Sequence, residues 1–301
     1  MGTQPIKVLI PNILHWFQNI YPEFKDDLEK IIEQKGLKKG IKYINEESKI
    51  EHPAVVTTNQ EIRVEESFLS YLWIICYCML VIFDELVQKP QNSIPNPDKG
   101  RLLKNSRELF RYGISLLKRY SDWKKHLPNP EIYEKADEYY ILKANSIFLN
   151  AFNFVICHEL SHVSLGHNDN PFSGIQESKE VTLQLEIDAD KGAIEIILKG
   201  IATEKTVRDR ITGLIVGLCS LLFFTSDLNG NDHPDPDDRL TVALKSLNLP
   251  EDDYNWGIAA MGFQLWADEN GLSLVIPTEV ETYKEWFSNV NEEIKRIKSL
   301  T

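Results

Sequence analysis

An uncharged, mostly apolar run extends from Phe68 to Phe83, and the helix that it predicts needs apolar neighbours on every side. A second run of this kind spans residues 211–225. Both are shorter than the roughly 20 residues that a helix needs to cross a bilayer. Acidic pairs flank the first run at 65–66 and 84–85, so the positive-inside pattern is absent. We therefore expect a buried core helix, while peripheral membrane contact stays open.

Composition excludes several classes of protein. The chain has 301 residues, of which 43% are hydrophobic and 26% charged, as in ordinary globular proteins. Because 33 basic residues stand against 45 acidic ones, the net charge is −12, and broad contact with nucleic acid phosphates is excluded as a first hypothesis. The four cysteines lie among apolar residues, which is typical of a reducing compartment. We expect a cytoplasmic protein without a nucleic acid partner, and membrane association stays open.

The pattern of apolar residues predicts a mainly α-helical chain with a small β element, an α+β fold. A hairpin is expected within 40–64, where Val55 and Val56 precede Ile62 and Val64 across a polar turn. Helical spacing recurs in the other segments. The predicted helices cover 13–35 with a break at Pro22, 68–83, 101–126, 144–165, 178–199, 203–225, 236–247, 253–268 and 278–298.

Residues 89–100 are rich in Pro, Asn and Gly and predict a loop at a boundary. We expect an N-terminal part with helices and the hairpin (1–95) and a second part (96–301), closely packed or forming a single domain. The segment 101–126 is strongly basic in an acidic protein. We interpret it as an amphipathic helix with a solvated basic face. The alternatives are partner docking, contact with lipid, covering a cleft, or recognition of an activator.

The motif that carries chemistry is His158-Glu159-Leu160-Ser161-His162, within the predicted helix that Gly166 ends. Two histidines four residues apart project from one helical face and can bind one metal ion. Glu159 can contact a water on that metal without being a ligand. A catalytic zinc site has three protein ligands and an open position, so a third ligand must come from elsewhere in the chain.

Two residues compete as the third ligand. His167 is near in sequence, but the extended three-histidine pattern requires glycine at 165 and histidine at 168, where this chain has Leu165 and Asn168. Glu186 is the other candidate, on a predicted helix in which small residues would allow a close approach to the histidine helix. On that helix Asp190 follows one turn later, where its carboxylate can accept the free ring N–H of a ligand histidine.

A third element is Asp232-His233-Pro234-Asp235-Pro236, followed shortly by Arg239. One interpretation is structural, since Asp235 and Pro236 together are typical of a helix N-terminus. The functional interpretation is that His233 donates a hydrogen bond to the oxyanion formed at a scissile carbonyl, while Arg239 pairs with a carboxylate near the metal.

These three elements, His158-Glu159-x-x-His162, Glu186-x-x-Ala189-Asp190 and His233-Pro234-x-x-x-x-Arg239, resemble the gluzincin metallopeptidases. Chain length and composition look more like the Lit-type phage-exclusion peptidases than the membrane-embedded CAAX prenyl proteases. The resemblance covers roughly residues 145–245. It departs from the family pattern at Asp235, Asp237 and Asp238, whose charge would disfavour an oxyanion role of His233.

The resemblance implies a zincin-like metallopeptidase core with zinc ligands His158, His162 and Glu186 and the general base Glu159. Asp190, His233 and Arg239 would be supporting groups. It further implies a protein or peptide substrate, elongation factor Tu in the best-known case, cut in response to phage; an activating peptide stays open. Two rival hypotheses are a non-catalytic metal-binding regulatory module and a membrane-embedded CAAX-protease-like metallopeptidase.

Overall fold

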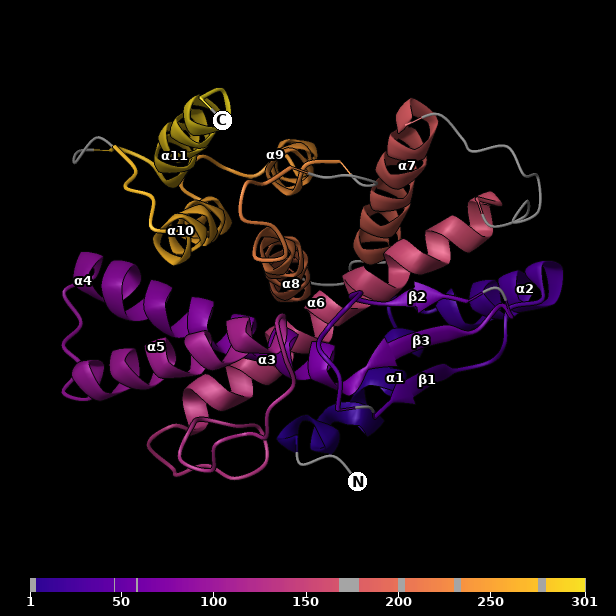
Figure 1. Ribbon diagram of the computed structural model, residues 1–301, viewed down its shortest axis with the longest axis horizontal. Coiled ribbons are helices and arrows are strands. Elements are labelled where there is room, and N and C mark those ends of the chain that lie inside the picture. Colours follow the sequence, from indigo (N-terminus) through magenta and orange to yellow (C-terminus); the bar gives the residue numbers. More distant parts are fainter. Residues whose placement is uncertain are drawn as a thin grey trace.

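The computed structural model describes residues 4–45, 47–57, 59–167, 179–199, 204–229, 234–275 and 280–300. It is mostly helical with one small sheet, which confirms the predicted fold class at that level. The elements are η1 (Pro5–Leu9), α1 (Ile10–Gln18), α2 (Phe24–Lys35), β1 (Ile41–Ile44), β2 (Val55–Val56), β3 (Ile62–Glu65), α3 (Glu66–Phe83), the π-helical η2 (Asp84–Gln88), α4 (Lys89–Gln91), α5 (Lys99–Leu116), α6 (Glu138–Leu165), α7 (Lys179–Leu198), α8 (Glu204–Leu222), α9 (Pro236–Ser246), α10 (Tyr254–Glu269) and α11 (Tyr283–Lys298) (Figure 1).

The predicted core helix at 68–83 is confirmed, because α3 is buried along nearly its whole length. By length and composition alone, two described helical stretches could cross a membrane, Glu66–Gln91 and Glu138–Leu165. Inside the molecule, 94% of the apolar window of the first and 72% of that of the second are buried against other elements. Burial of this kind is what core helices of a globular protein show.

Helix α6 is the central element. It crosses the molecule in Figure 1 with α7 and α8 on one side and α3 packed against it on another. Glycines permit the close approach of α8, because a Cβ built on Gly213 would lie 2.8 Å from the backbone nitrogen of Ala151. The apolar run within 211–225 therefore packs in the core against α6.

The sheet has the strand order β1-β3-β2. The predicted hairpin is confirmed: β2 pairs antiparallel with β3, Val55 opposite Arg63 and Val56 opposite Ile62. Its turn contains Gln60 with φ 54°, whose N–H donates to the carbonyl of Thr57. Strand β1 pairs parallel with β3, a pairing the sequence did not indicate. This leaves β2 as an edge strand, next to α6 (Figure 1).

Two boundary predictions are wrong in part. The predicted loop at 89–100 is helical at both ends, since α4 covers its first residues and α5 begins at Lys99. The basic helix ends at Leu116 instead of continuing to 126, and the chain then returns along α5 in nonhelical conformation. Buried side chains from Ile6 to Ile294 belong to one hydrophobic cluster. The division at residue 95 stays a prediction.

Candidate active site

The two histidines of the motif lie on α6, one helical turn apart. His158 is 7% exposed, and its Nε2 lies 3.1 Å from the Nε2 of His162. The ring centroids are 4.7 Å apart with the planes at 79°. Because residues i and i+4 share one face of a helix, both Nε2 atoms point to the same side of α6.

Helix α7 brings Glu186 opposite this pair. Its two carboxylate oxygens lie 3.2 Å from Nε2 of His158 and 3.3 Å from Nε2 of His162. The predicted close approach of α7 is confirmed at Gly192, where a Cβ would lie 2.7 Å from the Oγ of Ser161 on α6. The small side chain of Ala189 is fully buried on the same helix.

His158, His162 and Glu186 form a group that could hold a metal ion, because one donor atom from each lies within 4.8 Å of the other two. The spacing suits zinc. Tetrahedral bonds of about 2.0–2.1 Å place ligand atoms about 3.3–3.4 Å apart. The observed separations of 3.1, 3.2 and 3.3 Å are close to that value. Two imidazoles and a carboxylate are also a ligand set that catalytic zinc uses.

Asp190 connects this group to α9. Its carboxylate accepts from the Nδ1 of His158 at 2.9 Å and from the Nε and Nη2 of Arg239, both at 2.7 Å. Burial alone would raise the pKa of Asp190, but Arg239 and His158 hold that pKa at about 2. The carboxylate is therefore ionised, and it fixes the His158 tautomer that leaves Nε2 free to bind a metal.

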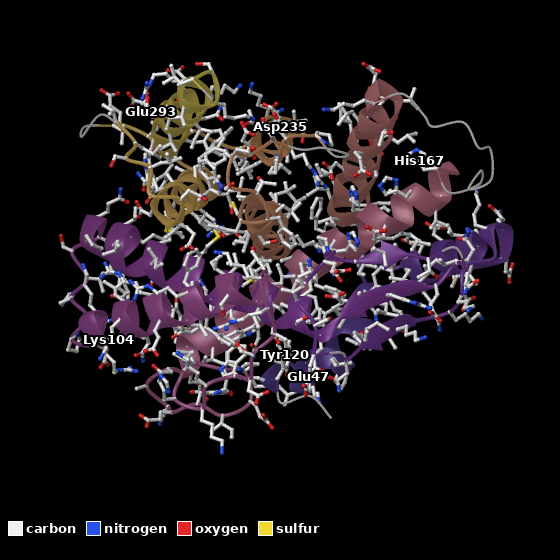
Figure 2. All side chains as sticks on the ribbon, viewed as in Figure 1. Glu47, Lys104, Tyr120, His167, Asp235 and Glu293 are labelled. Carbon is white, nitrogen blue, oxygen red and sulfur yellow. The ribbon has the colours of Figure 1, made fainter. Side chains whose placement is uncertain are left out.

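His167 contacts the Nδ1 of His162, as Asp190 contacts the Nδ1 of His158. Its Nδ1 lies 2.9 Å from the Nδ1 of His162, so one of the two rings donates to the other. Figure 2 shows His167 near the end of α6, beside α7. The residue lies beside the cluster and lines the cleft, and is not one of the three converging donors. His167 is half-buried.

A cleft of about 620 Å³ opens over these residues. Glu159 lies in its wall; burial raises the pKa of this carboxylate, while His158 and His162 act in the opposite direction. For His158, burial alone would lower the pKa, but the hydrogen bonds with Asp190 and Glu186 raise it to about 9. The ring thus has a strong electrostatic preference for a cation at its position, either a proton or a metal.

Other cleft residues were not recognised in the sequence. The edge strand β2 and the segment 51–54 before it line one wall, beside Glu159. An apolar wall contains Phe154, Leu221 and Phe224. The two adjacent β-branched residues of β2 were the only local signal, and they indicated a strand without indicating what it faces.

The third motif is described only from Pro234 onward, so the predicted oxyanion donor His233 lies outside the described residues. Pro234 and Pro236 line the cleft, and α9 begins with Asp235 at its N-cap position. The Asp235 side chain makes no capping hydrogen bond. It accepts instead from Lys298 on α11 at 2.7 Å, and Lys298 also donates to the buried Asp237 at 2.8 Å.

The comparisons with known proteins agree with the class that this site defines. A family model described as peptidase U49 matches residues 62–259, which include the described cluster on α6, α7 and α9. The chain thus falls among the peptidases, and it belongs to the peptidase U49 family. The expected resemblance to Lit-type peptidases is supported at this family level.

One curated relative is the cell death peptidase of Escherichia coli (strain K12), which is 30% identical over 161 residues. The aligned region is 49% of this chain and 51% of the relative, so it spans about half the length of that protein. No solved structure matches the chain.

Proposed function

We propose that this chain is a zinc-dependent endopeptidase with the metal ligands His158, His162 and Glu186 in a zincin-like core. The observation that carries the proposal is the convergence of these three donor atoms, at the ligand spacing of tetrahedral zinc, on one side of a cleft. Membership in a peptidase family supports a peptide bond as the target.

Zinc bound there would supply a Lewis acid that lowers the pKa of water from about 15.7 toward about 7 and polarises the peptide carbonyl. The chain's own residues handle the proton. Glu159 would accept it from the attacking water and deliver it to the nitrogen of the leaving amine. The raised pKa of its half-buried carboxylate would make Glu159 a stronger base than an exposed glutamate.

Three residues would hold the ligands in position. Asp190 orients His158 and is itself held by the two-pronged hydrogen bond from Arg239, while His167 orients His162. His233, which precedes the cleft-lining Pro234, would donate to the oxyanion. Acidic residues near His233 in the sequence would disfavour that role. Their effect is reduced because Lys298 forms ion pairs with Asp235 and Asp237 and offsets part of the negative charge.

The substrate would bind as an extended peptide added to the edge strand β2, whose backbone can pair with it as one more strand. The apolar wall of Phe154, Leu221 and Phe224 would receive an apolar side chain. The resemblance suggests a cytoplasmic protein as the target, with elongation factor Tu as the first substrate to test and phage exclusion as the setting.

The experiment is elemental analysis of purified protein together with incubation with elongation factor Tu. Wild type should carry about one zinc per chain. Glu186→Ala should lose it, whereas Glu195→Ala, which removes an exposed acid from the same helix, should retain it. Glu159→Gln should retain zinc and lose cleavage, because Glu159 acts on the proton and does not ligate.

Absence of zinc in wild type purified without chelator would overturn the proposal. Zinc retained in Glu186→Ala would overturn the ligand set. If wild type binds zinc but cleaves none of the proteins offered, the rival hypothesis of a non-catalytic metal-binding regulatory module is favoured.

A further inference from the structure

A basic groove runs along α5, apart from the cleft. Its first wall is one face of α5, and its second wall is the returning segment 117–124. The groove has a volume of about 950 Å³ and shares no lining residue with the active-site cleft. Figure 2 shows Lys104 and His167 at opposite ends of the molecule. The exposed cations that line the groove are Lys104, Arg107, Arg111, Arg119 and Lys124.

Most of these cations form no salt bridge with the acidic residues that the structure describes. Glu108 in the groove is engaged by Lys124 at 3.6 Å and by His126 at 2.9 Å. Within the described ranges, no salt bridge engages Lys104, Arg107, Arg111 or Arg119. Four cations without a salt bridge share this groove with only two carboxylates, Glu108 and Asp122, so the groove is positive in a chain whose net charge is −12. An anionic ligand would offset this positive charge, and the charge contrast would direct it to the groove.

The groove is also held in shape. Tyr112 forms its floor, and the phenol donates to the carbonyl of Ser121 at 2.8 Å while Gln4 donates to both groups. Two residues after Ser121, the indole of Trp123 packs against Tyr112 with ring centroids 5.3 Å apart. These contacts fix the returning segment to α5, so the backbone positions of the cations are set before a ligand binds. Binding would therefore cost little conformational entropy in this part of the chain.

We propose that this groove binds an acidic segment of a protein partner. A peptide fits because the half-buried Leu103 offers an apolar contact between the cations. Glu108 and Asp122 in the walls would repel the dense charge of a phosphate backbone but tolerate a mixed peptide. Apart from the half-buried Leu103, the large apolar side chains of α5 are buried in the core, so the described residues of this helix offer no continuous apolar face for insertion into a bilayer.

The test is fluorescence anisotropy with full-length protein at low salt. The probe is a labelled peptide in which Glu and Asp alternate with Leu and Tyr, and the control probe carries Gln and Asn at the acidic positions. The Glu159→Gln background keeps any cleavage from consuming the probe, and binding is scored without reference to activity, so the proposal stands or falls separately from the metal chemistry.

Reversing two cations with Arg107→Glu/Arg111→Glu should weaken binding of the acidic probe about tenfold, and Arg107→Gln/Arg111→Gln about threefold. The matched control Lys25→Glu/Lys39→Glu changes the net charge equally at exposed sites that line a different pocket, and should stay within about twofold of the starting protein. Unfolding midpoints verify that each variant is folded.

Equal binding of both probes, or equal weakening in the groove variant and the matched control, would overturn the proposal. So would binding of phosphatidylserine vesicles or duplex DNA that depends on Arg107 and Arg111 while the acidic peptide does not bind. The first two results would indicate nonspecific attraction, and the last would assign the groove to a different class of ligand.

Discussion

The contact between Gly192 and Ser161 sets how closely α7 approaches α6, and replacing Gly192 by alanine tests that contact. A Cβ at position 192 would lie 2.7 Å from the Oγ and 3.1 Å from the Cβ of Ser161. Ser161 is buried, and its hydroxyl donates to the carbonyl of Cys157, so it has little freedom to withdraw. The two helices would have to separate by a few tenths of an ångström.

The magnitude follows from two opposing contributions. Alanine in place of glycine inside a helix stabilises by about 1 kcal/mol. Overpacking of a buried contact costs about 1–3 kcal/mol. We therefore expect Gly192→Ala to lower the free energy of unfolding by about 0–2 kcal/mol. With Ser161→Ala in the background, the closest clashing atom is gone, and the same substitution should be neutral or stabilising.

The assay is guanidinium unfolding of wild type, both single variants and the double variant, with chelator present so that metal binding does not contribute. We expect a coupling free energy of about 1–2 kcal/mol between positions 161 and 192. Zinc affinity should follow the same pattern, because His158 and Glu186 lie on the two helices that Gly192 keeps together. An equal cost of Gly192→Ala in both backgrounds would refute the packing argument.

Three further predictions concern the supporting charges. Asp190→Asn should weaken zinc binding about 10–100-fold in a competition titration, because the neutral amide no longer polarises His158; unchanged affinity would contradict this. Lys298→Met should lower the unfolding free energy by about 1–3 kcal/mol, since it removes a cation that donates to the buried Asp237. An unchanged unfolding midpoint would show that this contact does not stabilise the fold. The guanidinium of Arg296 lowers the pKa of Glu293 from 4.5 to about 2, so wild type should exceed Glu293→Gln in stability above pH 4.5 and lose that advantage as the pH falls toward about 2; a pH-independent difference would exclude the linkage.

Much of the candidate site could be predicted from spacing alone. The four-residue separation of His158 and His162 needs only a regular helix to bring both rings to one side, and the apolar surroundings of the motif predict that helix. Glu186 and Asp190 are likewise one turn apart, so a single second helix brings both to the histidines. Helical periodicity therefore predicts those pairs of site residues that lie one turn apart on the same helix.

Contacts that depend on the docking of distant elements could not be predicted in this way. Lys298 meets Asp237 across 61 residues of chain, and nothing in the sequence near either residue indicates the pairing. The same holds for β1, which needs β3 as a parallel partner before it becomes a strand. The basic helix was predicted too long because basic residues continue past Leu116. The helix ends there, and the chain returns along α5, where Tyr112 donates a hydrogen bond to the carbonyl of Ser121.

The charges of the cluster are compatible with the proposed divalent ion. The charge of Asp190 is offset by Arg239, which donates two hydrogen bonds to it. Beside the carboxylates of Glu159 and Glu186, His158 has a pKa of about 9 and holds a proton when no metal is bound. A metal has to replace that proton, because a histidine binds a metal only in its neutral form. Two negative charges in a buried site are costly unless they are compensated nearby. A 2+ ion held by His158, His162 and Glu186 would balance both carboxylates at once while leaving Glu159 ionised, which is the state in which a general base can accept a proton.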